Sequence, residues 1–558
     1  MKSNRLFRSC FAAMIVSLSA GSYADNIKVI SSDYTDSGNH IGEVYDFFDV
    51  SVRTERGNPV EKPARFGRNA KVNTVRMLGG WYNQDLSGDT YLWDGEKFTY
   101  NFEAATRRID HWIENDWDIF QIVLDNPPWA FQEGYNFVEE PDGVHYLAKD
   151  RVGVYGNGLP PQDPKAWNTY IQSFIGHLVD KYGKETVESW RFRVGSEIDT
   201  RPQHWSATRQ EFFDHYENTV EAVHAVLPEA AIGVHFREAA FVSQYVDYTG
   251  EKEDAYATHF VSWAKENNVP YDFLAISYYP MVTHPEEMDM DAVYQNHMAP
   301  ILEHEDYNSD ASFEIHEFKY IVKMKRAGFS SVESSHGSAF FALFSKMMLE
   351  KNVGRLFQWG NVKRDGTYNS EALTQSALFD MVGNELYQSN VEGEPKTEGN
   401  LIDGIFTRKA DDSGFDLLMF SFNKDDFSYQ DDENIAVELK VDQPKNTKYR
   451  YRVAQFDRSN NREQMFFAEF PKSQQSSSEG GWRNDDVHTL APVNDALNEE
   501  GRKFFNSVKD KYDGVNELKW SEWKTSSVVD EGVEGSMIKI TNTIPSFSVQ
   551  KYQIEWLK

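Results

Sequence analysis

Residues 163–197 read DPKAWNTYIQSFIGHLVDKYGKETVESWRFRVGSE, and this stretch decides which fold the chain can form. The pair Asp163-Pro164 suits the N-cap and first turn of a helix. From Trp167 onward, bulky apolar side chains recur every three or four residues, and Gly183 stands where a C-cap is expected. The apolar run Ser189–Glu197 follows almost at once. We therefore predict a helix that packs against the strand after it.

The same alternation of helical patterns and short apolar runs extends from about residue 45 to residue 385. Parallel strands joined by helices produce such alternation, and eight of them close a barrel. The fold class is therefore predicted to be α/β, with a (β/α)8 TIM barrel. The predicted strands are Phe48–Arg53, Asn73–Leu78, Asp118–Asp125, Ser189–Glu197, Ala231–Phe236, Phe273–Tyr279, Ser312–Phe318 and Arg355–Trp359.

Beyond about residue 390 the chain changes to short strand-like runs between polar turns, with one helical stretch near residues 497–511. This pattern predicts a C-terminal β-sandwich accessory domain. We expect a signal peptide at 1–24, a catalytic barrel at 25–385 and a sandwich at 386–558. Residues 25–45 could instead join the sandwich.

The first 24 residues have the pattern of a secretory signal. Three basic residues precede a short apolar stretch that is too short to span a bilayer, and Ser22-Tyr23-Ala24 resembles a cleavage site. Cys10, the only cysteine of the chain, would leave with this segment, which excludes disulfides and thiol chemistry. We expect an exported protein, periplasmic or extracellular.

The chain is strongly acidic, with 57 Lys+Arg against 88 Asp+Glu and a net charge of −31. Nucleic-acid binding and docking on anionic membranes both need basic surface, so we expect neither partner. No zinc-protease, phosphate-loop, dinucleotide or EF-hand motif is present, so we expect no cofactor and no metal site, although an acidic chain could hold a structural Ca²⁺. The sequence leaves the oligomeric state open.

Two glutamates close predicted strands. Glu197 ends the fourth strand and Glu317 lies near the end of the seventh. Barrel enzymes carry their chemistry at the C-terminal ends of the strands. Two carboxylates about 5 Å apart there suit retaining hydrolysis of a glycoside: one, kept protonated by burial, protonates the leaving oxygen, and the other attacks the anomeric carbon.

Several segments, in their order along the chain, carry a resemblance to a known family. They are Trp117–Trp129 (WDIFQIVLDNPPW), Pro160–Glu197, Phe260–Pro280 (FVSWAKENNVPYDFLAISYYP) and Phe313–Phe318. Together they resemble glycoside hydrolase family 39 of clan A, the family of β-xylosidases and α-L-iduronidases. The β-rich C-terminal region is similar to that family's sandwich.

The resemblance implies roles for individual residues. Glu197 corresponds to the acid/base and Glu317 to the nucleophile. Arg76, near the end of the second strand, matches an arginine that keeps the nucleophile ionised, since a neighbouring guanidinium lowers a carboxyl pKa. A structural salt bridge is the alternative for Arg76.

Aromatic residues are the other candidates for substrate binding. Trp359, at the end of the eighth strand, matches the aromatic floor of the sugar site, with an ordinary core tryptophan as the alternative. Tyr279 is expected to contact substrate or nucleophile, whereas its neighbour Tyr278 could point into packing. Trp129 is the favoured sugar-stacking platform among the loop tryptophans, which include Trp205.

The chain departs from the family pattern around both glutamates. Ser196 replaces an asparagine that bonds the 2-hydroxyl of the sugar, and His316 replaces a threonine; both are retained as candidate substrate-binding residues. We hypothesise that Gly195 and Ser196 clear room for a modified C2, although drift is an equal explanation. Arg201, Arg237 and His204 could grip an anionic group, or serve as surface ion pairs.

The sequence therefore predicts a secreted retaining glycoside hydrolase that acts by double displacement. Its expected substrate, and partner, is an oligosaccharide or polysaccharide from a plant or algal wall, such as a sulfated or anhydro-sugar galactan like carrageenan. A β-xylosidase proper is one alternative, and a catalytically weakened carbohydrate-binding protein on the same scaffold is another.

Overall fold

The computed structural model describes residues 160–557 apart from 162, 201–203, 206, 241–255, 326–327, 360–369, 470–498, 513–516 and 531–534. Nearer the start of the chain it describes positions within 102–114 and the short segments 27–31, 45–48, 71–76, 91–93, 98–100, 118–124, 137–139 and 145–147. The predicted signal peptide lies outside the described residues.

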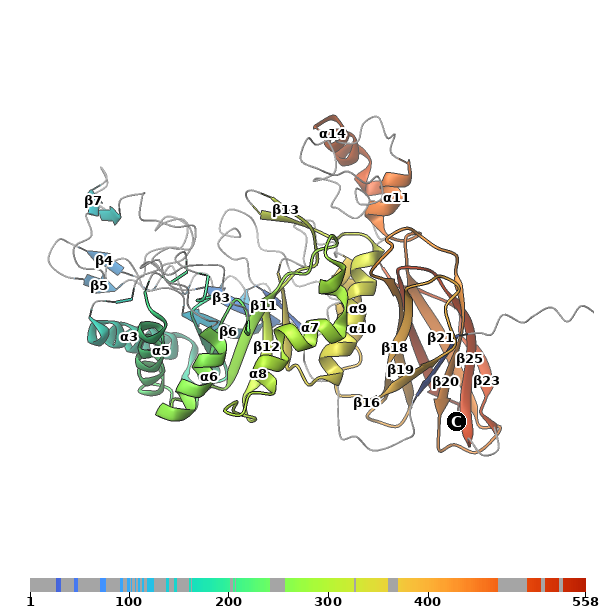
Figure 1. The fold of residues 1–558 in the computed structure, drawn as a ribbon, viewed down its shortest axis with the longest axis horizontal. Coiled ribbons are helices and arrows are strands. Elements are labelled where there is room, and N and C mark those ends of the chain that lie inside the picture. Colours follow the sequence, from blue (N-terminus) through green and yellow to red (C-terminus); the bar gives the residue numbers. More distant parts are fainter. Residues whose placement is uncertain are drawn as a thin grey trace, which may run out of the picture.

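Eight parallel strands close a barrel (Figure 1). In order around it they are β2 (Tyr45–Phe48), β3 (Lys71–Arg76), β6 (Asp118–Leu124), β9 (Arg191–Val194), β10 (Ile232–His235), β11 (Phe273–Tyr278), β12 (Ser312–Phe318) and β15 (Arg355–Trp359). Seven of the predicted strands overlap these closely. The first prediction, Phe48–Arg53, is wrong in position: the strand ends at Phe48, where Tyr45–Phe48 pairs with Leu356–Trp359.

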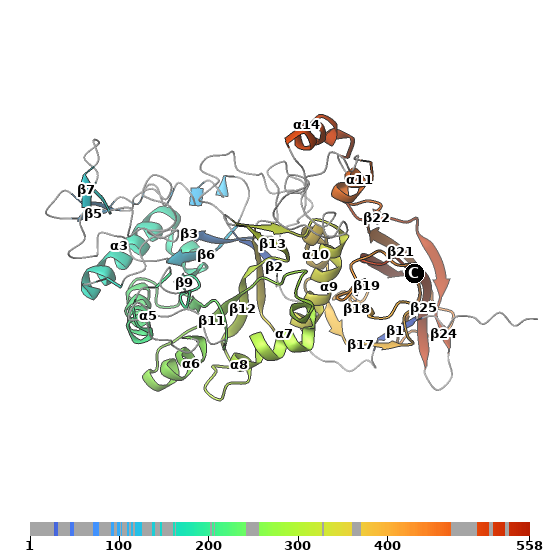
Figure 2. The same ribbon diagram turned by 45° about the horizontal axis from the view of Figure 1, so that its top comes forward.

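Helices cover the outside of the barrel between successive strands (Figure 2). They are α3 (Pro164–Tyr182), α4 (Lys184–Glu188), α5 (Arg209–His224), α6 (Tyr256–Asn267), η5 (Pro285–Met288), α7 (Met290–His297), α8 (Ala299–Leu302), α9 (Ser335–Glu350) and α10 (Ser370–Phe379). The prediction for residues 163–183 is confirmed. The Asp163 carboxylate accepts from the backbone N–H groups of Lys165 and Ala166, and Gly183 is the C-cap with φ 88°.

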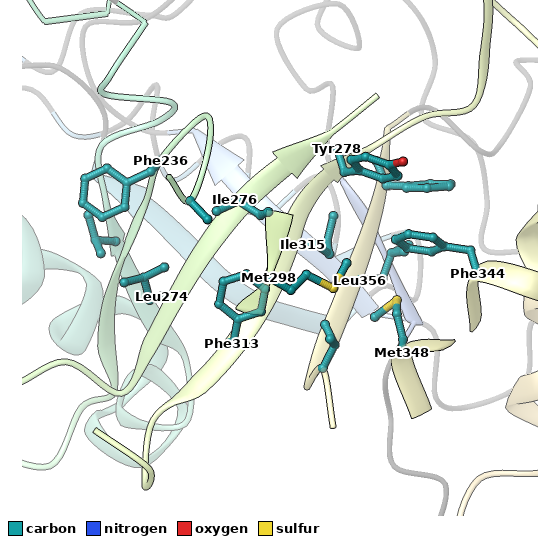
Figure 3. Close-up of a cluster of buried hydrophobic side chains, with 14 of the residues drawn as sticks. Phe236, Leu274, Ile276, Tyr278, Met298, Phe313, Ile315, Phe344, Met348 and Leu356 are labelled. Atoms are coloured by element: carbon teal, nitrogen blue, oxygen red, sulfur yellow. The ribbon is translucent and has the colours of Figure 1, made fainter. Parts of the chain in front are cut away.

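Aromatic residues at the ends of β11 and β12 pack on helix α9: Tyr278 and Phe318 both lie against Phe344. Figure 3 shows Phe313 and Ile315 of β12 among buried apolar side chains that include Phe344 and Met348 of α9. Tyr278 stacks on Phe344 at 5.4 Å between ring centroids, so this tyrosine belongs to the packing. Side chains alternate along a strand, and the residues between these apolar ones consequently point into the barrel.

Two further sheets form the β-rich domain. One contains β17 (Ser389–Glu392), β1 (Ile27–Ser31), β20 (Glu433–Lys440), β25 (Ser536–Ile544) and β24 (Val529–Asp530). The other contains β16 (Glu385–Tyr387), β18 (Asn400–Arg408), β19 (Gly414–Asn423), β26 (Ser548–Trp556), β21 (Lys448–Phe456), β22 (Lys519–Trp520) and β23 (Lys524–Ser527). Apolar residues of both sheets share one buried cluster, as in a sandwich. Residues 27–31 supply a strand of the first sheet, paired with β20 and β17.

Shorter elements complete the described chain. They are the hairpins β4–β5 (Tyr91–Trp93, Phe98–Tyr100), β7–β8 (Phe137–Glu139, His145–Leu147) and β13–β14 (Ile321–Lys325, Gly328–Ser331), and the helices α11 (Arg462–Glu469), α14 (Glu499–Val508) and η7 (Lys509–Tyr512). None of the described helices has both the length and the apolar character needed to cross a membrane.

Candidate active site

Glu197 is presented by a tight turn after β9. Its backbone has φ 47°, in the left-handed region that costs a residue with a Cβ, and its side chain is buried. Gly195 begins this turn with φ 73°. A Cβ on Gly195 would meet the Ile198 side chain at 2.5 Å, so the glycine permits a close turn. The idea that Gly195 clears room for substrate is not supported, because Ile198 fills that space.

Glu317 is aimed into the barrel by a bulge in β12. Ile276 pairs with Ile315, but the next residue of β11, Ser277, pairs with Glu317, so β12 carries one extra residue at His316. A bulge re-aims the side chains that follow it. As a result both His316 and Glu317 are buried inside the barrel.

Two hydroxyl groups lie against the Glu317 carboxylate. Tyr279 Oη donates to Glu317 Oε2 at 2.6 Å, and Ser196 Oγ is 3.5 Å from Oε1. Burial, followed by the charges of Glu317 and Glu197, raises the pKa of Tyr279 well above its ordinary value, so the phenol stays protonated as a donor. Tyr279 therefore lies within the electrostatic reach of both glutamates and hydrogen-bonds to one of them.

Glu197 is paired with an arginine that lies just past the end of the next strand, β10. Arg237 Nη1 lies 3.0 Å from Glu197 Oε1. Burial by itself raises the pKa of Glu197, but the charges of Arg237 and His204 and hydrogen bonds from Ser277 and Arg237 bring that pKa below its ordinary value. In this arrangement Glu197 is a buried, ionised carboxylate.

A second carboxylate network lies beside the Ser196–Glu317 contact. Arg191 Nη1 donates to Glu314 Oε1 at 2.7 Å, and His316 Nε2 lies 2.6 Å from Glu314 Oε2. Arg193 Nη1 lies 3.4 Å from His316 Nδ1, and Arg193 Nη2 donates to Ser196 Oγ at 3.2 Å. Both ring nitrogens of His316 thus face protein groups and the side chain is 0% exposed. The prediction that His316 binds substrate is not supported by this geometry.

The remaining predicted residues are placed as follows. Arg76 is the last residue of β3 and Trp359 the last of β15, so both stand at strand ends of the barrel, but their side chains lie outside the description. Trp129 lies outside the described residues, as does Arg201. Trp205 is buried against Phe212 and His215, which contradicts its use as a sugar platform.

Three residues lie against Glu197 or the turn that carries it: Ser277, which the sequence did not indicate as a site residue, and Arg237 and His204, which it indicated as candidates for gripping an anion or forming an ion pair. Ser277 hydrogen-bonds to Glu197, Arg237 pairs with the same carboxylate, and His204 donates to the backbone oxygen of Ser196 at 2.6 Å. The position of Arg237 and His204 just past strand ends was the available signal. Within the described part of the chain no group of three or more His, Cys, Asp or Glu residues is arranged to hold a metal ion.

Comparison with known proteins identifies the family of this chain. Residues 62–319 match the family described as "Glycosyl hydrolases family 39". An "Alpha-1,4-L-rhamnosidase" of Formosa agariphila is 32% identical over 534 residues, which cover 94% of this chain and 93% of the relative. The chain belongs to glycosyl hydrolase family 39. It is accordingly a glycoside hydrolase of a retaining family, with a carbohydrate as substrate.

Other similar proteins match over a shorter stretch or at lower sequence identity. A "Beta-xylosidase" of Caldicellulosiruptor saccharolyticus is 27% identical over 36% of this chain and 35% of its own length. Among solved structures, a monomeric β-xylosidase from Caulobacter crescentus CB15 superposes with a TM-score of 0.58 at 12% identity, covering 95% of this chain and 99% of that chain. A bacterial orthologue of human α-L-iduronidase gives 0.58 at 11% identity, covering 95% and 84%. These superpositions show a shared fold, a barrel with a β-rich domain.

Proposed function

We propose that this family 39 enzyme is an exported retaining α-L-rhamnosidase, with Glu317 as nucleophile and Glu197 as acid/base. The observation that carries the assignment of roles is the different surroundings of the two carboxylates. Among its described contacts, Glu317 lies against two hydroxyl groups, Tyr279 at 2.6 Å and Ser196 at 3.5 Å, which stabilise a negative oxygen as a nucleophile requires. Glu197 is paired with the partly exposed side chain of Arg237, which can exchange this carboxylate for another partner.

The proposed reaction has two displacement steps. A protonated Glu197 gives its proton to the glycosidic oxygen while the Glu317 carboxylate forms a bond to C1 and the bond from C1 to the leaving oxygen breaks. Glu197, now ionised, takes a proton from water as that water attacks C1 and releases Glu317. The Tyr279 hydroxyl steadies the charge of Glu317 before attack and after release.

The substrate assignment is supported by the relative that matches almost the full length of this chain, a rhamnosidase by its printed name. The β-xylosidases match about a third of the chain. An α-L-glycoside and a β-D-glycoside share the absolute configuration at C1, so one pair of carboxylates serves either sugar. The difference between them must therefore come from residues that contact the rest of the ring.

Ser196 is such a residue. In the preferred chair of L-rhamnose the 2-hydroxyl is axial, whereas in xylose it is equatorial. A side chain built to bond the equatorial group would approach the axial one from the wrong direction. The Ser196 side chain is short, and its hydroxyl accepts from Arg193 at 3.2 Å and lies 3.5 Å from Glu317, so it does not extend toward an equatorial 2-hydroxyl as a longer amide would. This favours rhamnose over xylose.

A substrate panel tests this proposal. Nitrophenyl α-L-rhamnoside, nitrophenyl β-D-xyloside and carrageenan oligosaccharides are incubated with the enzyme at equal concentrations and the released product is measured. We expect hydrolysis of the rhamnoside at least about tenfold faster than of the others, which corresponds to about 1.4 kcal/mol of transition-state binding. Faster turnover of the xyloside or of the galactan would replace this proposal with the corresponding activity.

Nucleophile trapping tests the mechanism separately. A 2-deoxy-2-fluoro rhamnosyl fluoride should add the mass of one glycosyl group to the protein, on the peptide that contains Glu317. Glu317→Gln should give no adduct, and Glu286→Gln, which changes an exposed glutamate of η5, is the control. Neither adduct nor turnover on any sugar would favour a carbohydrate-binding protein.

A further inference from the structure

Arg237 is the solvent-accessible partner in an ion pair whose other member, Glu197, is buried. Its side chain is 37% exposed, whereas that of Glu197 is 8% exposed. The backbone N–H groups of Arg237 and Glu238 donate to the buried carboxylate of Asp199, which fixes the start of this segment two residues beyond Glu197 in sequence. Burial raises the pKa of Asp199 to about 7, against the effect of those backbone donors. The backbone of Arg237 is thus fixed by hydrogen bonds, while its side chain is partly exposed to solvent.

This pairing conflicts with the proposed task of Glu197. A general acid must carry a proton when substrate is bound, yet a guanidinium 3.0 Å away favours the ionised form. The groups that interact with Glu197 come from three neighbouring strand ends. They are His204 after β9, Arg237 and Glu238 after β10, and Ser277 and Tyr279 at and just past the end of β11. Glu317 on β12 acts on the same Tyr279.

Among these described groups Arg237 is the one with a permanent positive charge. Burial and the neighbouring Glu197 raise the pKa of Glu238, although Arg237 opposes this, and with all these groups in place the pKa of Glu197 still lies below its ordinary value. Protonation of Glu197 therefore calls for a negative group on the substrate that binds the Arg237 guanidinium in place of Glu197. Carboxylates and sulfate esters fit this task, because a guanidinium binds either with two parallel hydrogen bonds.

The position of Glu197 says which part of the substrate carries that negative group. An acid/base residue protonates the oxygen of the leaving sugar, so its immediate partner lies on the leaving-group side of the cleaved bond. Arg237 also lies 5.3 Å from the centroid of the Tyr279 ring, which keeps the guanidinium next to the reacting centre.

We propose that Arg237 is a binding residue for an anionic substituent on the leaving-group sugar, and that occupying it releases Glu197 to take up the proton that it later donates. The inference rests on the proposed role of Glu197 as acid/base. Substrate recognition and protonation of Glu197 would then be coupled. A uronate or sulfated sugar draws Arg237 away from Glu197 and so favours protonation, whereas a neutral sugar in the same place does not.

Proton uptake tests this inference without any knowledge of the cleaved sugar. Glucuronate, glucose 6-sulfate and glucose are titrated into the full-length enzyme in weakly buffered solution, and the heat of binding and the pH change are followed. We expect tighter binding of one or both anions than of glucose, with uptake of up to one proton per molecule in wild type. The two anionic arms tell a carboxylate site from a sulfate site.

Three variants make the result decisive. Glu197→Gln should bind the anion with no proton uptake, and Arg237→Gln should bind the anions no better than glucose. Arg237→Lys keeps the charge, so it should retain anion preference with weaker binding, which guards against misfolding as the explanation for Arg237→Gln. Anion binding without uptake in wild type, or binding unaltered in Arg237→Gln, would overturn the proposal.

Turnover gives the second readout. Rhamnosyl-α-1,4 disaccharides that end in glucuronate or in glucose differ at one substituent. The kcat profile, which reports the bound enzyme, should extend to higher pH with the glucuronate than with the glucose, whereas kcat/KM should lose activity over the same pH range with both. Identical kcat profiles contradict the inference, while failure to cleave any rhamnoside contradicts only the proposed function.

Discussion

Two Glu–Arg pairs in one barrel have opposite characters. Glu314 and Arg191 are 2% and 10% exposed and are joined by two parallel hydrogen bonds, with the guanidinium also 3.8 Å from the Phe273 ring centroid. Glu197 and Arg237 are joined through one carboxylate oxygen, and the arginine is over a third exposed. The first pair is enclosed by protein and the second is open to a ligand. Their comparison teaches that the same two residue types serve structure when both are buried and function when one can change partner.

The largest expected effect comes from the open pair. Glu197→Gln should lower turnover of an unactivated rhamnoside by about 10²- to 10⁴-fold, because general acid catalysis is lost. The free energy of unfolding, from urea denaturation, should change little. Azide should restore part of the rate on an activated nitrophenyl substrate and give a glycosyl azide. A full loss of folding in this variant would show that the open pair is structural after all.

The enclosed pair should behave in the reverse way. Glu314→Gln should lower the free energy of unfolding by about 3–5 kcal/mol, since it leaves the Arg191 charge buried without its partner. The midpoint of urea unfolding measures this loss. The double variant Arg191→Met, Glu314→Leu is the control, and it should recover much of the stability because no buried charge is left. A single variant as stable as wild type would remove the distinction between the two pairs.

The hydrogen bond from Tyr279 to the proposed nucleophile, Glu317, should have the next largest effect. Tyr279→Phe removes the 2.6 Å hydrogen bond to Glu317, which as a bond to a charged group is worth about 1.5–3 kcal/mol. We therefore expect kcat/KM to fall by about ten- to a hundredfold. Tyr278→Phe is the matched control, since that hydroxyl bonds to the backbone oxygen of Glu287 away from the site. Equal losses in the two variants would contradict the placement of Tyr279.

The smallest expected effect is a pH dependence of stability. The pKa of His316 is lowered to about 3 by burial, so below its unfolded value the unfolded chain gains a proton that the folded chain does not, and stability falls as pH falls. Burial alone would raise the pKa of Glu314, but Arg191 and His316 hold it well below its ordinary value; its contribution is complete above the unfolded pKa and is lost below it. Both effects therefore favour unfolding in acid.

Urea denaturation at pH 7, 5.5 and 4 measures this dependence. His316→Gln should reduce the loss of stability over the whole range from pH 7 to 4, and most steeply below about pH 6, because there the unfolded histidine is protonated and the folded one is not. Part of the loss near pH 4 should remain, because Glu314 contributes it. Stability that is constant from pH 7 to pH 5.5 in wild type would show that His316 is protonated in the folded protein.

Much of the barrel follows from sequence because helical stripes and apolar runs report directly on burial. The position of Glu197 also follows, since a turn after an apolar strand is visible in the run that ends at Gly195. The bulge in β12 is not visible in this way. Strict alternation after Phe313 and Ile315 would send Glu317 outward with them, and only the register with β11 reveals the extra residue that turns it inward.

The same bulge accounts for the wrong prediction that His316 contacts substrate. Next to a candidate nucleophile in sequence, it lies instead among Glu314, Arg191 and Arg193. Glu314 itself carried an available signal, a carboxylate between two apolar residues of a buried strand. Arg237 was named for its place at a strand end, but its pairing with Glu197 depends on the tertiary structure.

Strand β1 has a consequence for how the protein is made. Ile27 pairs with Ile435, so the first described strand of the chain finds its parallel partner only after the whole barrel has been synthesised. At roughly 5–20 residues per second this wait lasts on the order of tens of seconds. The β-rich domain cannot be prepared intact from residue 386 onward, because an interior strand of one sheet, β1 between β17 and β20, would be missing. The sheet that contains β1 is therefore assembled from two segments of the chain with the barrel between them.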